Sequence, residues 1–188
     1  MRTKASLIMI IDHYHAFSLT DADTPGQCED PPLDISIVID QTNSVGADNY
    51  DSMLDSIKNL ISQYDVGEDK THFSIVTYSK DAKIRVSLDD PKYHSVEALH
   101  DLLDEMKDKD KLGNPTRTDN ALKTVGEKVF VEKNGDRPES PNIMIIFTDG
   151  GTHKSSKPYS TVLPTLDVSY CQHLSKRNQA MQIQTARI

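Results

Sequence analysis

One short apolar run constrains the fold of this chain more than any other feature. Residues 35–39 read Ile-Ser-Ile-Val-Ile, and a run of this length, rich in β-branched side chains, is typical of a buried strand in a parallel sheet. The run stops at Asp40, and Thr42 and Ser44 follow at alternate positions. In open α/β sheets ligands bind just beyond the carboxyl ends of the strands, so these side chains form a candidate site. A carboxylate and hydroxyls are hard oxygen ligands, which suit Mg²⁺ or Mn²⁺ better than zinc or copper.

The same residue types are also common in ordinary loops and helix caps, so this segment alone leaves both interpretations open. A second segment favours a site. Residues 142–147 form another buried-strand run, which ends in Thr148-Asp149-Gly150-Gly151. Two neighbouring parallel strands that each end in an acid would bring Asp40 and Asp149 to one crevice.

A third segment, with Thr116 and Thr118, precedes a helical pattern and offers two more hydroxyls. The three motifs together, Asp40-x-Thr42-x-Ser44, Thr116-x-Thr118 and Thr148-Asp149-Gly150, resemble the von Willebrand factor A domain. The resemblance covers residues 34–151, and the family usually has Ser where this chain has Thr42. It implies a metal-ion-dependent adhesion site that holds Mg²⁺ or Mn²⁺ on five residues: Asp40, Thr42, Ser44, Thr116 and Asp149.

The remaining periodicities predict an α/β fold with the element order β-α-β-β-α-α-β. Further strands are expected at residues 72–78 and 82–88, and helices at residues 49–63, 95–106 and 119–131. The link at residues 79–81 is too short for a helical crossover, so the strand after it must be an antiparallel edge strand. The expected architecture is a doubly wound, mostly parallel sheet with that one antiparallel edge, in which the first and fourth strands are neighbours.

After residue 151 the resemblance fails, because no further buried-strand run follows. We therefore expect an incomplete domain at residues 33–168, with its C-terminal strands missing, and an irregular tail at residues 169–188. The fourth strand would then be an exposed edge, which predicts marginal stability or self-association. A monomer that melts cooperatively well above about 45 °C would contradict this hypothesis.

Residues 1–32 are interpreted as a flexible leader. Its start is basic, and the apolar residues 5–11 that follow sketch a short secretory signal without a clear cleavage site. Cys28 and Cys171 flank the expected domain, and their state, paired or free, stays open. No run is long enough for a transmembrane helix. The net charge of −8 in 188 residues argues against nucleic acid as a partner.

The resemblance implies an extracellular adhesion or protein-binding module that is not an enzyme. Its metal would bridge to an acidic residue of a matrix, collagen-like or cell-surface protein. Thr118 is expected to cap the next helix, and Asp119 is a candidate for an indirect role at the metal. Two alternatives stay open: a structural matrix protein with a vestigial site, and a Mg²⁺-dependent phosphotransferase or hydrolase. The phosphotransferases of the haloacid dehalogenase type need a second Asp where Thr42 stands.

Overall fold

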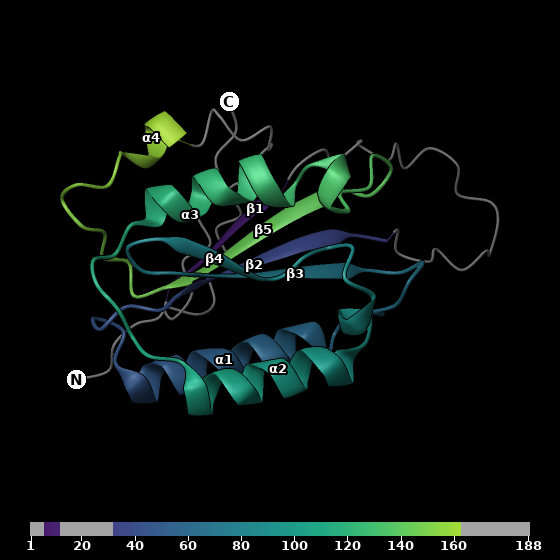
Figure 1. Cartoon of the computed structure of the whole chain (residues 1–188), viewed down its shortest axis with the longest axis horizontal. Coiled ribbons are helices and arrows are strands. Elements are labelled where there is room, and N and C mark those ends of the chain that lie inside the picture. The colour runs from purple at the N-terminus through teal and green to yellow at the C-terminus, as the bar shows by residue number, and fades with distance from the viewer. Residues whose placement is uncertain (1–5, 12–31, 163–188) are drawn as a thin grey trace, which may run out of the picture.

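The computed structural model describes residues 6–11 and 32–162, and its centre is a five-stranded sheet (Figure 1). The strands are β1 (Ser6–Ile11), β2 (Asp34–Asp40), β3 (His72–Tyr78), β4 (Ala82–Val86) and β5 (Asn142–Thr148), and their order in the sheet is β1-β5-β2-β3-β4. β2 pairs in parallel with both β3 and β5, whereas β4 runs antiparallel to β3. The predicted adjacency of the first and fourth strands of the domain, which are β2 and β5, is confirmed.

Helices cover both faces of the sheet, as expected for a doubly wound fold. α1 (Ala47–Ile61) and α2 (Val96–Lys109) lie side by side on one face (Figure 1). α3 (Thr118–Thr124) lies on the other face and continues as a π-helical turn over Val125–Val129. The short helix α4 (Tyr159–Val162) follows β5 on the side of α3, and two 3₁₀ turns lie at Pro91–Tyr93 and Glu132–Asn134.

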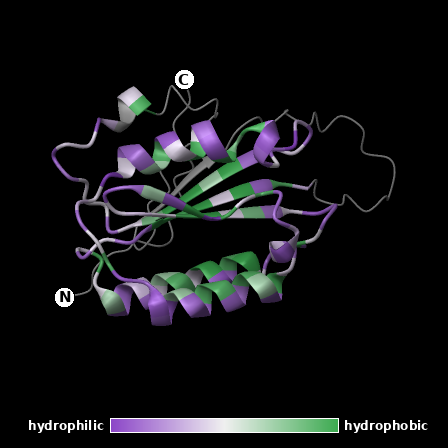
Figure 2. Ribbon diagram, viewed as in Figure 1, coloured by the Kyte–Doolittle hydropathy of each residue, from purple (hydrophilic) through white to green (hydrophobic). Residues whose placement is uncertain are grey.

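Two apolar cores separate the sheet from its helices. Alternate residues of the central strands face α1 and α2, among them Ile37 and Ile75, and the residues between them face α3, among them Val38 and Val76. Figure 2 accordingly shows hydrophobic colouring along the central strands and mixed colouring on the helices. Because both faces of β2, β3 and β5 are buried, their sequences read as nearly continuous apolar runs.

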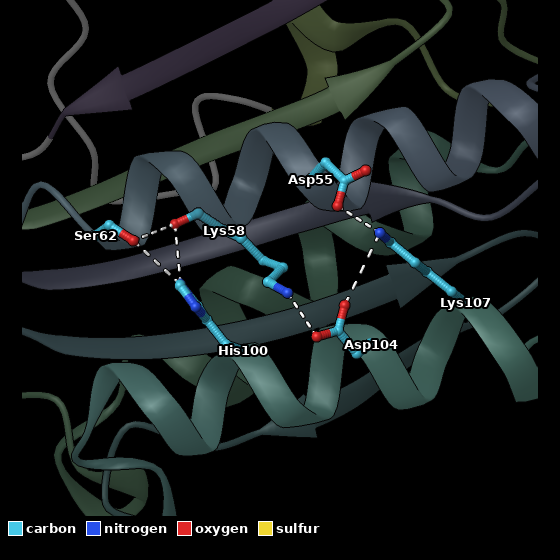
Figure 3. Close-up of polar contacts among 6 residues, drawn as sticks. All are labelled: Asp55, Lys58, Ser62, His100, Asp104 and Lys107. Carbon is cyan, nitrogen blue, oxygen red and sulfur yellow. Dashed lines mark hydrogen bonds and ion pairs between the residues drawn. The ribbon is translucent and has the colours of Figure 1, made fainter.

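Polar contacts join α1 to α2 along their outer sides (Figure 3). Lys58 pairs with Asp104, and Lys107 pairs with Asp55 and lies 3.9 Å from Asp104. The His100 ring contacts the backbone oxygen of Lys58 at 3.1 Å. Exposed ion pairs contribute little to stability, so we assign the attachment of these helices to their apolar faces.

The sheet has a second antiparallel edge strand, which the sequence analysis did not predict. β1 lies within the expected leader and pairs with β5 over six residue pairs, from Ser6 opposite Thr148 to Ile11 opposite Ile143. The prediction that the fourth strand is an exposed edge is therefore wrong, because β1 satisfies its backbone groups. The rest of the expected leader, the expected tail and both cysteines lie outside the described residues.

Removal of residues 1–11 should turn the chain into a self-associating protein. The deletion leaves the backbone N–H and C=O groups along one side of β5 unpaired, and such an edge is a template for pairing with another chain. Light scattering after size-exclusion chromatography, on both chains at one concentration, checks the expected rise in mass. A truncated chain with unchanged mass and melting temperature would mean that β1 does not protect β5.

At the end of the sheet where β3 begins, two histidine rings are stacked. The ring centroids of His72 and His94 lie 4.0 Å apart, and His72 is only 6% exposed. Its Nε2 contacts the backbone oxygen of Glu68 at 2.9 Å, and its Nδ1 has no hydrogen-bond partner among the described residues. Burial lowers the pKa of His72 and outweighs the hydrogen bond to the Glu68 carbonyl, which raises it; the nearby charges of Arg137 and His94 lower the pKa further.

This lowered pKa predicts that the protein loses stability in mild acid. The unfolded chain takes up a proton at His72 near pH 6.5, whereas the folded chain resists protonation to lower pH. The contribution of His72 is therefore complete above about pH 6.5 and is lost as the pH falls from there toward the folded pKa. Urea midpoints at about pH 7.5 and about pH 5.5 should differ more for the unaltered chain than for His72→Phe. Equal differences in the two proteins would rule out His72 as the source.

Candidate metal centre

The candidate site lies where β2 and β5 end. Asp40 is the last residue of β2, and Asp149 directly follows the last residue of β5, Thr148. The two strands are parallel, and Ile39 lies opposite Phe147, so their carboxyl ends meet at one edge of the sheet. The topology therefore brings the two predicted acids to the same place.

The Asp40 carboxylate is fully buried, and both of its oxygens accept hydrogen bonds. Oδ1 accepts from the backbone N–H of Thr42 at 3.2 Å and from its hydroxyl at 2.7 Å. Oδ2 accepts from the hydroxyls of Thr148 at 2.8 Å and Tyr78 at 3.2 Å. Burial raises the pKa of Asp40, the Thr42 and Thr148 hydroxyls oppose this shift, and the charge of Asp149 adds to it.

Three hydroxyls form a chain that begins at this carboxylate. Thr42 Oγ1 lies 2.9 Å from Ser44 Oγ and 3.3 Å from Thr116 Oγ1. A hydroxyl has one proton to donate and two lone pairs that accept. Because Thr42 donates to Asp40, it accepts from both Ser44 and Thr116. Four of the five predicted ligands are thus joined by hydrogen bonds.

The Thr116 loop is attached to the loop after β2 by backbone pairing. Gly113 donates to the carbonyl of Gln41 and accepts from the N–H of Asn43, both at 2.9 Å. A Cβ atom at Gly113 would lie 2.7 Å from Ser79 Oγ, so only glycine allows this approach without a shift. This pairing brings a loop from far along the sequence against Thr42.

Asp149 lies at the same edge but outside the hydroxyl chain. It is partly exposed, and its Oδ1 accepts a hydrogen bond from the N–H of Gly151 at 3.1 Å. Gly150 between them has a φ of +89°, a conformation that favours glycine. The negative charge of Asp149 raises the pKa of Asp40, in addition to the effect of burial.

The structure corrects one predicted role and adds two residues. Thr118 does not cap α3, because Arg117 occupies the N-cap position and Thr118 already has helical backbone; its buried hydroxyl instead contacts Tyr78 OH at 3.4 Å. Tyr78 was missed as a partner of Asp40. Its position opposite Asp40 in the β2–β3 register is the signal that identifies it. Thr148 was noted only as part of a motif, although it contacts Asp40 directly.

The oxygen atoms at this edge that could bind a metal suit a hard divalent cation. They are carboxylate and hydroxyl oxygens, which Mg²⁺ and Mn²⁺ prefer. Within residues 6–11 and 32–162, no three or more His, Cys, Asp or Glu side chains gather in a way that could hold a metal. A metal site in this part of the chain therefore needs ligand atoms other than three such side chains, and hydroxyl oxygens are the ones that gather beside Asp40.

A sequence model of the von Willebrand factor type A (VWA) domain matches residues 34–170. The chain belongs to the VWA domain family. This match covers most of the chain and begins at the first residue of β2. The fold class expected from the sequence is therefore confirmed.

The similar curated proteins are much longer than this VWA chain. The human collagen alpha-5(VI) chain is 29% identical over 142 residues, which are 76% of this chain and 5% of the collagen. Human integrin alpha-D is 26% identical over 162 residues, 86% of this chain and 13% of the integrin. Chicken matrilin-3 is 28% identical over 126 residues, 65% of this chain and 27% of the matrilin.

Solved structures show the same fold. Proximal thread matrix protein 1 from the mussel byssus matches with a TM-score of 0.64 and 26% identity, over 73% of this chain and 35% of the byssus protein. A structure of that protein with a zinc-occupied MIDAS motif matches at 0.60 and 22% identity, over 72% and 35% of the two chains. Manganese-loaded TRAP from Plasmodium vivax matches at 0.53 and 14% identity, over 58% and 42%. Two of these three structures therefore contain a divalent metal.

The named relatives of this VWA domain are matrix and adhesion proteins. They are named as collagens, an integrin and a matrilin, which agrees with the expected extracellular location and with a role that is not enzymatic. Within the described residues, no helix has the length and apolar character needed to cross a membrane.

Proposed function

We propose that this VWA domain is a metal-ion-dependent protein-binding module of the extracellular matrix or cell surface. Asp40, Thr42, Ser44, Thr116 and Asp149 would hold Mg²⁺ or Mn²⁺. The observation that carries the proposal is the hydroxyl chain, in which Ser44 and Thr116 both meet Thr42 beside the Asp40 carboxylate. Oxygen atoms from two loops that lie far apart in the sequence meet there.

The coordination that Mg²⁺ requires favours an acidic partner. The proposed ligands include two carboxylates, of which Asp40 is buried and Asp149 is partly exposed, and three neutral hydroxyls. Mg²⁺ binds about six oxygens and usually retains several waters, so the bound ion supplies a coordination position that a carboxylate from outside can fill. Ser44 is exposed and Thr116 is partly exposed, which leaves this position open to a partner.

The phosphotransferase alternative is less well supported by the surroundings of Asp40. A nucleophilic carboxylate must reach its substrate, but Asp40 has no exposed surface and both of its oxygens accept hydrogen bonds from buried donors. Thr42 stands where a general acid would be needed, and its hydroxyl proton is already donated to Asp40. These contacts favour a binding site over a reaction centre.

Water-proton relaxation with bound Mn²⁺ tests the proposal. Mn²⁺ on the protein should enhance the relaxation of the waters that it retains. A blocked Gly-Glu-Gly peptide should reduce this enhancement because its carboxylate displaces a water, whereas the matched Gly-Gln-Gly peptide should not. The Asp149→Ala variant should show little enhancement at all.

Two results would contradict the proposal. One is the absence of any enhancement with the unaltered chain, which would mean that Mn²⁺ does not bind. The other is an enhancement that both peptides leave unchanged, which would mean that the bound ion has no position open to a carboxylate. Each peptide is also measured with free Mn²⁺, so that simple chelation is subtracted.

A further inference from the structure

The loop that follows Asp149 is fastened to the loop that carries Thr116. The backbone carbonyl of Thr116 accepts two hydrogen bonds from this loop, one from the N–H of His153 at 2.9 Å and one from the hydroxyl of Ser156 at 3.1 Å. The loops that carry two proposed ligands, Thr116 and Asp149, are thus connected by hydrogen bonds.

Asp119 is the centre of this connection. It lies in the first turn of α3 and is only 4% exposed. Arg117 donates to both of its carboxylate oxygens, from Nε and Nη2, each at 2.9 Å. The backbone N–H of Lys157 donates to Oδ2 at 3.1 Å, so the same carboxylate also fixes the far end of the loop.

The charge of Asp119 is kept by these contacts. The Arg117 guanidinium beside it holds the pKa of this carboxyl well below its usual range, and the bond from the N–H of Lys157 acts in the same direction, against the effect of burial. Charge-assisted bonds of this forked kind are stronger and more directional than neutral ones. Arg117 is itself anchored, since its backbone N–H donates to the carbonyl of Ser79 at 2.8 Å.

We propose that Asp119, oriented by Arg117, is a positioning residue of the metal site, because it holds the loop after β5 against the Thr116 loop. It thereby sets the placement of Asp149 relative to Thr116 without touching the ion. This inference rests on the proposed function. An asparagine at position 119 has one acceptor oxygen, so it cannot accept the Arg117 fork and the Lys157 N–H in the same way.

Calorimetric titration with Mn²⁺ on the unaltered chain, Asp119→Asn and Arg117→Gln tests the inference. Both variants should bind Mn²⁺ about 10- to 100-fold more weakly, as is usual when a residue that orients metal ligands is changed. Glu127→Gln is the matched control, because Glu127 pairs with Lys123 on the exposed side of the same helical segment. Its affinity should equal that of the unaltered chain.

Hydrogen exchange separates a positioning role from a merely structural one. In Asp119→Asn the amides of His153 and Lys157 should exchange faster, in parallel with the loss of Mn²⁺ affinity. Faster exchange with unchanged affinity would overturn the inference and leave the proposed function intact. An unaltered chain that does not bind Mn²⁺ would overturn both. If Asp119→Asn does not fold, Arg117→Gln decides, since it keeps the carboxylate and removes only the fork.

Discussion

Replacement of Arg137 by methionine should lower the free energy of unfolding by about 3–5 kcal/mol, the usual result of leaving a buried charge without its partner. Asp34 begins β2 and has no exposed surface. The Arg137 side chain donates to its Oδ1 from Nε at 3.0 Å and from Nη2 at 2.7 Å, and Nη2 also donates to the carbonyl of Leu33. Methionine keeps much of the length of the side chain and removes these charged donors, so that only the backbone N–H of residue 137, at 2.8 Å from Oδ2, still donates to Asp34.

Urea unfolding of Arg137→Met, monitored by circular dichroism, measures this loss. Lys123→Met is the control, because the pair of Lys123 with Glu127 is exposed and its removal should change stability by less than about 1 kcal/mol. A second comparison adds Asp34→Leu to Arg137→Met, which removes the unpaired charge and should recover part of the stability. A loss below about 1 kcal/mol in the single variant would show that the pair does not hold the start of β2.

The Thr42→Val variant should strongly weaken metal binding. Its hydroxyl is the one atom that contacts Asp40, Ser44 and Thr116 together. Valine has nearly the same shape but cannot donate or accept, so we expect Mn²⁺ affinity to fall by more than about 100-fold, beyond the usual effect of changing a residue outside the ligand set. Stability should fall by about 1–3 kcal/mol, because the buried Asp40 oxygen keeps only the weaker backbone donor.

Thr42→Ser provides the matched control, since serine keeps the hydroxyl and is the residue usual at this position in the family. We expect its Mn²⁺ affinity to remain within a few-fold of the unaltered chain. Calorimetry for affinity and urea unfolding for stability distinguish the two consequences. If Thr42→Val and Thr42→Ser bound Mn²⁺ equally well, the hydroxyl would have no part in the site.

Much of the domain could be predicted from the sequence because its signals are local. The apolar runs that become β2 and β5 are buried on both faces, so they are recognisable without knowledge of their neighbours. The position of Asp40 and Asp149 at one edge follows from the order of strands and helices. The convergence of Thr42, Ser44 and Thr116 followed from the family resemblance, and the backbone pairing around Gly113 that produces it has no local signal.

The two wrong predictions, the exposed edge of β5 and the capping role of Thr118, share one physical origin. The apolar residues that form β1 satisfy the requirements of a short secretory signal and of a strand equally well, and only pairing with the distant β5 distinguishes the two. Thr118 has the composition of a helix cap, but α3 begins one residue earlier than that role requires, and the hydroxyl contacts Tyr78 in the interior. Both outcomes depend on tertiary contacts that no local pattern contains.

The central claim is that the ends of β2 and β5 bind a divalent cation, and a calorimetric titration of Mn²⁺ and Mg²⁺ tests it most directly. We predict binding of one ion per chain, loss of that binding in Asp149→Ala, and unchanged binding in Asp101→Ala, which removes an exposed carboxylate from α2 instead. Absence of binding by the unaltered chain, or equal binding by Asp149→Ala, would contradict the claim.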